Sequence, residues 1–360
     1  MDDIQRKINA IEKEMHDTPY HKGTEHYIGK LRAQLAILKA KIQDSGSRKG
    51  GGGGAGFAVA KHGDATVVLV GFPSVGKSTL LNKITTAYSR TAEYAFTTVS
   101  VIPGMMKYKG ASIQILDVPG LIEGAAAGKG RGRKVLSVVR SADLLAVIVE
   151  SGKEKDFDKI EKELYENGVR INQAPPNVEV RKTIRGGLKI NSTVRQDLDK
   201  DTVGEVCREF RITNAEITLK ENVTLDRLID ALVSNRIYTK AIWIVNKIDK
   251  HRFDPKKVSR DTVVGISSDK DIGLEELKEA IWNALGLVRV YLKEPGKEID
   301  YKFPLIVKKS FKISDVMDKI STEFKEGIKE VKIWGPGARF PGQTVSFSTR
   351  VEDNMQIMFV

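Results

Sequence analysis

Residues 66–79 read TVVLVGFPSVGKST, an apolar run followed directly by a loop that contains two glycines. The apolar run is typical of a buried strand, and the loop has the spacing of a phosphate-binding loop that leads into a helix. In such a loop, successive backbone N–H groups point at one phosphate and a lysine neutralises the phosphate oxygens. The stretch therefore predicts a strand, loop and helix that together bind a nucleotide.

The loop residues have individual roles in that prediction. Gly71 and Gly76 let the backbone turn tightly around a phosphate, because glycine accepts conformations that other residues avoid. Lys77 is expected to neutralise the β- and γ-phosphate oxygens and to act in catalysis, and Ser78 is expected to give its hydroxyl to Mg²⁺. All nine residues of the loop are expected to contact the nucleotide: Gly71, Phe72, Pro73, Ser74, Val75, Gly76, Lys77, Ser78 and Thr79.

A second motif, DVPG at 117–120, follows the apolar run at 113–116. The carboxylate of Asp117 is expected to hold Mg²⁺ through a water molecule, and the N–H of Gly120 is expected to reach the γ-phosphate. Both residues are therefore assigned to the nucleotide site, Asp117 as a metal ligand and Gly120 as a catalytic residue.

A third motif, NKID at 246–249, follows the apolar run at 241–245. The carboxylate of Asp249 can accept hydrogen bonds from N1–H and the 2-amino group of guanine, whereas it would repel the acceptor N1 of adenine. Together with Asn246 and Lys247 it predicts a site that selects GTP over ATP.

Ser267 and Ser268 follow the strand expected at 262–266, and they resemble the loop of sequence SA that supports the guanine in GTPases. Ser268 stands where alanine is usual. Both serines are assigned to the nucleotide site. The order of the motifs, each at the end of an apolar run, predicts a guanine-nucleotide switch.

Composition restricts the class of protein. The chain has 360 residues, of which 41% are hydrophobic, so it can bury a large core and form several domains. Its longest apolar runs have the length of strands rather than the ~20 residues that a bilayer requires. The charged start lacks an apolar signal core, the single cysteine forms no intramolecular disulfide, and the five histidines suggest no metal site. We expect a cytoplasmic protein with no membrane partner.

The net charge of +12 permits a nucleic-acid partner. The excess is spread along the chain: residues 1–61 carry 11 basic and 7 acidic side chains, and residues 169–240 and 288–360 each carry 13 and 10. Such a distribution suits several separate contacts with RNA in a ribonucleoprotein. A mildly basic surface without an RNA partner is equally compatible with the composition.

Alternating strands and helices from residue 65 predict an α/β fold with a doubly wound, mostly parallel sheet covered on both faces. The expected strand after residue 167 is delayed by some seventy residues, which indicates an inserted module. The expected segments are a helical hairpin at 1–45, a glycine-rich joint at 46–64, a nucleotide-binding domain at 65–168 and 241–287, an inserted α+β module at 169–240 and a β-grasp module at 288–360.

Two segments outside the motifs allow more than one interpretation. The hairpin is interpreted as a packing element, and no DNA partner is expected, because it shows no basic recognition face. The segment WGPGARFP at 334–341 is either a surface for RNA or protein, or a turn set by Gly and Pro with Trp334 in the core.

The glycine joint, the phosphate loop, FTT at 96–98, DVPGLIEGAAAGKGRGR at 117–133 and NKID together strongly resemble the developmentally regulated GTP-binding proteins, a branch of the Obg superfamily. The resemblance covers nearly the whole chain. It implies a P-loop GTPase domain, an insert like domain 2 of ribosomal protein S5 and a C-terminal TGS domain. It also implies Mg²⁺ as cofactor, an association with ribosomes and translation, and in eukaryotes a dedicated regulatory protein partner. The glycine-rich Obg domain of bacterial relatives is absent, so their mode of ribosomal docking does not transfer.

The resemblance assigns further residues and reveals two departures. Thr98, the second threonine of FTT, is expected to bind Mg²⁺ and the γ-phosphate and to act in catalysis. Leu121 occupies the position at which Ras-like enzymes place a water-orienting glutamine, so we expect slow hydrolysis. Ser74 occupies the position of an asparagine through which many relatives bind K⁺, which leaves backbone oxygens as the route to a potassium ion.

Two functions stay open. The first is a GTPase switch that binds the ribosome, rRNA or tRNA in translation, and the second is a regulatory switch that controls a protein partner without RNA contact. The basic cluster Lys129, Arg131, Arg133 and Lys134 in the second switch is either a GTP-ordered contact face or a solvated run of charge. An RNA-modifying activity is not expected, because the insert and the C-terminal module carry no cluster of cysteines or carboxylates, and Cys207 stands alone in the insert.

Overall fold

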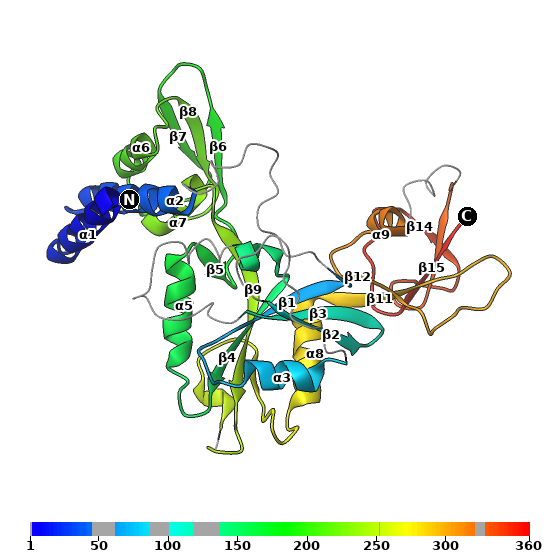
Figure 1. Ribbon diagram of the computed structural model, residues 1–360. Coiled ribbons are helices and arrows are strands. Elements are labelled where there is room, and N and C mark those ends of the chain that lie inside the picture. The colour runs from blue at the N-terminus through cyan, green and yellow to red at the C-terminus, as the bar shows by residue number, and fades with distance from the viewer. Residues whose placement is uncertain (1, 45–61, 87–100, 119–136, 252, 321–327) are drawn as a thin grey trace. The chain divides into compact units, whose positions relative to one another are not determined.

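The computed structural model describes residues 2–44, 62–86, 101–118, 137–251, 253–320 and 328–360 (Figure 1). These residues divide into two units. One contains the described residues up to 44 together with 164–238, and the other contains the rest. Each unit is described by itself below.

The larger unit is built on the predicted sheet, whose strand order is β10 (Val263–Gly265), β9 (Ile237–Asn246), β4 (Leu144–Glu150), β1 (Ala65–Val70), β3 (Ala111–Asp117) and β2 (Ile102–Tyr108). The pairs β1 with β3, β1 with β4, β4 with β9 and β9 with β10 are parallel, whereas β2 is antiparallel to β3. Every residue of β1 is buried, as expected for a strand covered on both faces. The predicted mostly parallel sheet is therefore present.

Helices cover both faces of this sheet, namely α3 (Lys77–Ile84), α5 (Asp156–Glu166) and α8 (Leu274–Leu285), and a short 3₁₀ helix, η2 (Pro255–Lys257), follows β9. Ile242 and Ile244 of β9 share one apolar core with α3 and α8. Trp243 lies between them and points to the other face, because side chains alternate along a strand. There its ring meets Phe157 of α5 edge to face at 5.1 Å. Figure 1 shows α3 and α8 near each other and apart from α5.

Strand β2 is not predicted, because Pro103 and Gly104 interrupt the strand pattern of its sequence. The strand forms a hairpin with β3 through Lys109 and Gly110, whose φ angles of 48° and 86° suit a two-residue turn. At Gly104 an added Cβ would lie 2.6 Å from a carbon of Thr85, so glycine is required by the close approach of the segment after α3.

The C-terminal module has its own sheet, in the order β12 (Leu305–Lys308), β11 (Leu287–Leu292), β15 (Met355–Phe359), β13 (Val331–Trp334) and β14 (Gln343–Val345), with α9 (Ile313–Ile320) beside it. Trp334 is only half-buried, and the ammonium of Lys293 lies 4.5 Å from its ring centroid. The interpretation that places Trp334 in the core is therefore wrong. Phe340 of the same segment is exposed. The assignment of this module as a TGS domain stays a prediction.

The smaller unit contains α1 (Asp2–Asp17), α2 (Glu25–Asp44), β5 (Val169–Ile171), β6 (Val178–Lys182), β7 (Leu188–Ser192), α6 (Lys200–Glu209), β8 (Ala215–Leu219) and α7 (Leu225–Leu232). Its sheet has the order β6, β8, β7, with β6 antiparallel and β7 parallel to β8. Strand β5 is not part of this sheet, and the N–H of Ile237, also in this unit, donates to the carbonyl of Gly168, which precedes β5.

The N-terminal helices share a core with the inserted module. Helices α1 and α2 are joined by an ion pair of 2.9 Å between Lys39 and Glu12, and Ile28 and Ala36 of α2 lie in one apolar core with α6, α7 and β8. At Gly29 an added Cβ would lie only 3.3 Å from a methyl carbon of Leu225, so the glycine lets α2 approach α7 closely. Two segments that the sequence separates by more than a hundred residues thus form one folding unit.

A charge network is buried in the same unit. Arg170, only 3% exposed, donates from Nε and Nη2 to the two carboxylate oxygens of Asp230 over 2.5 and 2.7 Å. Arg236 donates to the same carboxylate over 2.6 Å. The Arg170 guanidinium also lies 3.6 Å from the ring centroid of Tyr165. These contacts offset the cost of removing the charges from water.

The predicted domain limits stay predictions. Strand β9 already begins at Ile237, before the expected return to the nucleotide-binding domain at 241. Most of the glycine joint, residues 46–61, lies outside the described residues. Among the helices that the structure describes, none combines the length and apolar character needed to cross a membrane.

Candidate active site

The phosphate loop lies between the end of β1 and the start of α3, as the sequence predicts. Gly76 precedes α3 with φ of 96°, and a Cβ there would lie 2.4 Å from Nδ2 of Asn246. At Gly71 a Cβ would lie 2.4 Å from the carbonyl oxygen of Ile148. Both glycines are required because the loop passes this close to β4 and to the residue that ends β9.

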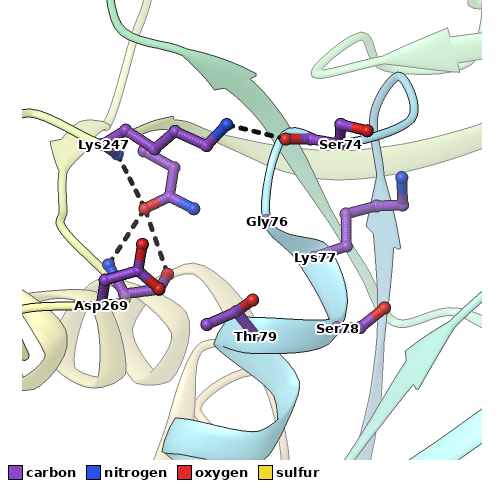
Figure 2. Close-up of a pocket in the computed structure, with 9 residues that line it drawn as sticks. Ser74, Gly76, Lys77, Ser78, Thr79, Lys247 and Asp269 are labelled. Carbon is purple, nitrogen blue, oxygen red and sulfur yellow. Dashed lines mark hydrogen bonds between the residues drawn. The ribbon is translucent and has the colours of Figure 1, made fainter. Parts of the chain in front are cut away.

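Lys77, the first residue of α3, reaches back over the loop. Its Nζ donates to the carbonyl oxygens of Gly71 and Phe72 over 2.9 and 2.8 Å. Figure 2 shows its side chain extending from the start of the helix along the loop. The ammonium is thereby fixed beside the N-terminus of α3, where the partial positive charge of the helix also favours an anion.

The two residues that the motifs assign to the metal lie together. The hydroxyl of Ser78 donates to Oδ2 of Asp117 over 2.7 Å. Asp117 is 1% exposed, and within the described part of the chain its Oδ1 has no hydrogen-bond partner. A buried carboxylate oxygen without a partner is costly unless a cation or a donor reaches it. Mg²⁺ prefers oxygen ligands of this kind, so the arrangement fits a magnesium ion.

Asn246 connects the guanine motif to two other loops. Its Oδ1 accepts from the backbone N–H of Lys247 over 2.8 Å and from both the N–H and the hydroxyl of Ser268 over 3.1 Å. Its Nδ2 donates to the carbonyl of Val75 in the phosphate loop over 2.9 Å. A dashed line in Figure 2 marks the bond to the backbone N–H of Lys247. The hydroxyl of Ser268, at the position where alanine is usual, thus adds a bond that alanine cannot make.

Lys247 makes a second link to the phosphate loop. Its Nζ donates to the carbonyl of Ser74 over 2.8 Å, as Figure 2 shows, and forms an ion pair of 3.0 Å with Glu150. Hydrogen bonds from Lys153 and then Lys247 lower the pKa of Glu150 to about 2. Glu150 is not among the residues that the motifs predict. The available signal is its place at the end of the apolar run that forms β4, at the same sheet edge as the motifs.

Asp249 is oriented by the serine pair. The hydroxyl of Ser267 donates to Oδ1 of Asp249 over 2.5 Å, and this bond lowers the pKa of Asp249. The carboxylate is therefore ionised near neutral pH and can act only as an acceptor. That is the state needed to accept from the two N–H groups of a guanine edge.

The motifs enclose a pocket of about 270 Å³, lined by Ser74, Gly76, Lys77, Ser78, Thr79, Asn246, Lys247, Ser268 and Asp269. The other predicted residues of the described chain are not in its lining: Gly71, Phe72, Pro73, Val75, Asp117, Asp249 and Ser267. Of these, Asp117 is bonded to Ser78, and Asp249 is bonded to Ser267, the neighbour of Ser268. Asp269 lines the pocket although no motif predicts it. Its position directly after the serine pair is the only signal in the sequence.

Several predicted residues cannot be placed. Thr98, Gly120 and Leu121 lie outside the described residues, and so does the basic cluster at 129–134. Their roles stay predictions.

The comparisons with known proteins agree with this geometry. The family described as 50S ribosome-binding GTPase matches residues 66–182, and the C-terminal region of the same domain type matches residues 185–287. Developmentally-regulated G-protein 3 of Arabidopsis thaliana is 41% identical, covering 100% of this chain and 99% of that protein. This chain belongs to the developmentally regulated GTP-binding proteins.

Other relatives of this member of the family carry similar names. An uncharacterised GTP-binding protein of Methanocaldococcus jannaschii is 44% identical, over 97% of this chain and 91% of that protein. Ribosome-interacting GTPase 1 of Saccharomyces cerevisiae is 40% identical, over 96% of each chain. Among solved structures, the Schizosaccharomyces pombe YchF GTPase covers 84% of this chain and 99% of its own, with 15% identity and a TM-score of 0.43.

Membership in the developmentally regulated GTP-binding proteins confirms three predictions. The fold is that of a P-loop GTPase with a mixed α/β sheet. The protein binds GTP and GDP, and it is a GTP hydrolase. GTPase domains generally use Mg²⁺, which the pair Ser78 and Asp117 fits.

Proposed function

We propose that this protein is a slow GTPase switch that associates with the ribosome or its RNA and acts in translation. The observation that carries the proposal is the bond between Asn246 and Val75, which holds the guanine motif and the phosphate loop around one pocket. A relative that is 40% identical is named Ribosome-interacting GTPase 1, which supports the ribosome as the partner.

In this proposal each part of the site has one task. The loop N–H groups and Lys77 bind the phosphates, and Asp249 accepts from the guanine edge. Asn246 and Lys247 hold the guanine motif next to the phosphate loop, while Ser267 orients Asp249. Lys77, Thr98 and Gly120 are the catalytic residues of the proposal.

Ser78, Asp117 and Thr98 would hold Mg²⁺. When bound, Mg²⁺ would neutralise the negative charge of the nucleotide phosphates during hydrolysis. We propose a role for K⁺ only through backbone oxygens, because Ser74 lacks the amide oxygen of asparagine.

Hydrolysis by the isolated protein should be slow. Leu121 has no hydrogen-bonding group, so it cannot orient the attacking water as glutamine does in Ras-like enzymes. We expect a rate on the order of 10⁻⁴ to 10⁻² s⁻¹, the range of intrinsic GTPases of this type. A partner would then be needed to accelerate hydrolysis. The partner would thereby set how long the protein stays in its GTP-bound state.

The partner is proposed to be ribosomal RNA or tRNA in the cytoplasm, where ribosomes work. The net charge of +12 supports a polyanionic partner. The hairpin, the S5-like insert and the TGS module are proposed as appendages that make contacts. A dedicated regulatory protein remains part of the proposal, because the resemblance implies one in eukaryotes. The second candidate function is a switch that controls such a protein without touching RNA.

Cosedimentation with purified ribosomal subunits separates the two functions. The full chain, loaded with a non-hydrolysable GTP analogue or with GDP, would be sedimented at 50 and 200 mM salt. RNA contact predicts association that weakens steeply with salt, because counterions are released from neutralised phosphates. Absence of cosedimentation in both nucleotide states, or association that is independent of salt, would favour the protein-partner function.

A further inference from the structure

The connection between β6 and β7 projects from one end of the insert's sheet (Figure 1). Hydrogen bonds to the residue before β8 hold both of its ends. Lys182 and Leu188 both pair with Ala215, the first residue of β8, so the connection passes over the end of β8. The N–H of Thr183 donates to the carbonyl of Asn214 over 3.1 Å, and the N–H of Gly187 donates to the Asn214 side chain over 2.9 Å. Only residues 184–186 extend beyond these bonds.

The projection is strongly basic. Residues 181–189, called the tip below, read RKTIRGGLK and contain four cationic side chains and no acidic one. All four are exposed. Lys182, Arg185 and Lys189 form no ion pair with any residue that the structure describes, whereas Arg181 contacts Glu179 at 3.2 Å.

Some partly buried cations of the same unit are paired with acidic side chains instead. Arg32 pairs with Asp226 at 2.9 Å, and Lys39 pairs with Glu12 at the same distance. Lys189 lies beside Glu216 in the strand register, but none of the three tip cations named above forms an ion pair with a residue that the structure describes. The tip therefore carries four cations and no acidic residue over nine positions, and such a concentration of positive charge attracts an anionic partner.

The end of the tip leaves room for another molecule to come close to its backbone. Ile184 is 98% exposed, the most exposed large apolar side chain in the described chain. Gly186 and Gly187 have φ of 111° and 71°, and a Cβ added at either would meet nothing within 4 Å. Space around both glycines is open, so another backbone can approach them without a side chain in between.

We propose that the tip binds RNA, with Lys182, Arg185 and Lys189 on backbone phosphates and Ile184 against a base or ribose face. The inference rests on the proposed association with ribosomal RNA and names the surface that makes the contact. RNA fits better than an acidic protein surface, because protein interfaces depend on a buried cluster of aromatic or apolar anchors. The tip offers a single exposed apolar side chain, Ile184, among cations, which is the pattern of phosphate contact with one inserted apolar residue.

The test uses the full chain and a fluorescein-labelled RNA hairpin with a twenty-base-pair stem, followed by anisotropy at several salt concentrations. The variant is Lys182→Ala, Arg185→Ala, Lys189→Ala. Its matched control is Lys13→Ala, Arg195→Ala, Lys200→Ala, which removes three exposed cations of the same unit outside the tip. Both variants change the net charge equally.

The slope of the logarithm of the binding constant against the logarithm of the salt concentration, called the salt slope below, measures how many phosphates are neutralised. In the tip variant this slope should become shallower by about one unit for each phosphate contact removed, hence by about 2 to 3 units in total. Its affinity at 0.1 M salt should fall by roughly tenfold or more. The control should change the slope by less than one unit. Ile184→Ala should weaken binding by a few fold and leave the slope unchanged, because it removes no charge, and its thermal unfolding should match that of the wild type.

The outcomes separate the inference from the proposed function. If the tip variant and the control lose the same slope on the hairpin, the tip is ordinary surface charge and the inference fails. If the tip variant loses association with ribosomal subunits but binds the RNA hairpin normally, the tip contacts an acidic protein surface and the inference also fails. If the wild type binds the hairpin through the tip but never cosediments with ribosomal subunits, the inference stands and the proposed ribosomal function fails.

Discussion

Nδ2 of Asn246 donates to the carbonyl oxygen of Val75 over 2.9 Å, and this bond joins the end of β9 to the phosphate loop. The same carboxamide accepts through Oδ1 from Lys247 and Ser268. One buried side chain therefore fixes three loops that come from distant parts of the sequence. Asn246 therefore positions both the part of the pocket expected to bind the guanine base and the loop expected to bind the phosphates.

Replacing Asn246 by Ala should weaken GDP binding by at least tenfold. The change leaves the carbonyl of Val75 and the N–H of Ser268 without their partner, and each buried unpaired group costs about 1–3 kcal/mol. Titration with a fluorescent GDP analogue measures the loss. Asn283→Ala is the control, because Asn283 lies exposed on α8. Affinity within twofold of the wild type would show that the three loops are held by other contacts.

Asp249→Asn should shift nucleotide preference from guanine toward xanthine. Asparagine supplies a donor for the C2 oxygen of xanthine, whereas the carboxylate accepts from the 2-amino group of guanine. Competition binding with GTP, XTP and ATP tests the exchange. The wild type should exclude ATP, so ATP within tenfold of GTP would contradict the role of Asp249.

Lys77→Ala should abolish GTP hydrolysis, because it removes the ammonium held at the phosphate loop. Thr98→Ala should reduce the rate strongly, and Leu121→Ala should change it far less. Single-turnover rates with GTP and Mg²⁺ give this order. A Leu121→Ala protein as inactive as Lys77→Ala would mean that residue 121 has a catalytic role that its side-chain chemistry does not explain.

Glu150→Gln should lower the thermal stability at neutral pH, and the difference from the wild type should disappear in acid. Lys153 and Lys247 hold the pKa of Glu150 at about 2, below its ordinary value of 4.5. A lowered carboxylate pKa adds stability that is fully present above the unfolded value and is lost as pH falls through the folded value. The two melting temperatures should therefore converge between about pH 4.5 and pH 2.

The control for that series is Glu275→Gln, because the Glu275 side chain is 73% exposed and pairs with Lys278 within one helix. Exposed pairs of this kind contribute about 0–1 kcal/mol. A Glu150→Gln protein that matched this control at neutral pH would show that the bond to Lys247 does not stabilise the fold.

Asp230→Ala should destabilise the smaller unit strongly. The change leaves Arg170, which is 3% exposed, as a buried charge without its carboxylate. Breaking a buried pair in this way typically costs about 3–5 kcal/mol. Urea unfolding measures the loss, and Asp226→Ala, which removes a half-exposed partner of Arg32, is the control. Equal midpoints for the two variants would contradict the buried network.

The GTPase core could be predicted from the sequence because its signals are local. The run at 66–70 is continuous and apolar, and the loop after it has fixed spacing, so strand, loop and helix are specified by neighbouring residues. The same holds for the strands that lead to Asp117 and Asn246. These strands are parallel within one sheet, with β3 next to β1 and β4 between β1 and β9, so their carboxyl ends bring the motifs together at one sheet edge.

The parts that could not be predicted depend on contacts between distant residues. Strand β2 contains Pro103 and Gly104, and it forms because it completes a hairpin with β3. The pairing of Lys247 with Glu150 spans almost a hundred residues. The shared core of α2 with α6 and α7 has no local signature either, since an amphipathic helix does not indicate which surface covers it.

The sheet of the smaller unit also affects solubility. Within the described chain, β6 and β7 are the outer strands of the order β6, β8, β7, so each has an edge whose backbone groups can template pairing with another chain. Lys182 ends β6 and Lys189 lies in β7, and charged side chains on edge strands oppose such pairing. The cations that we assign to RNA can thus also keep copies of the protein apart. Neutralised variants should accordingly be more prone to self-association at high concentration.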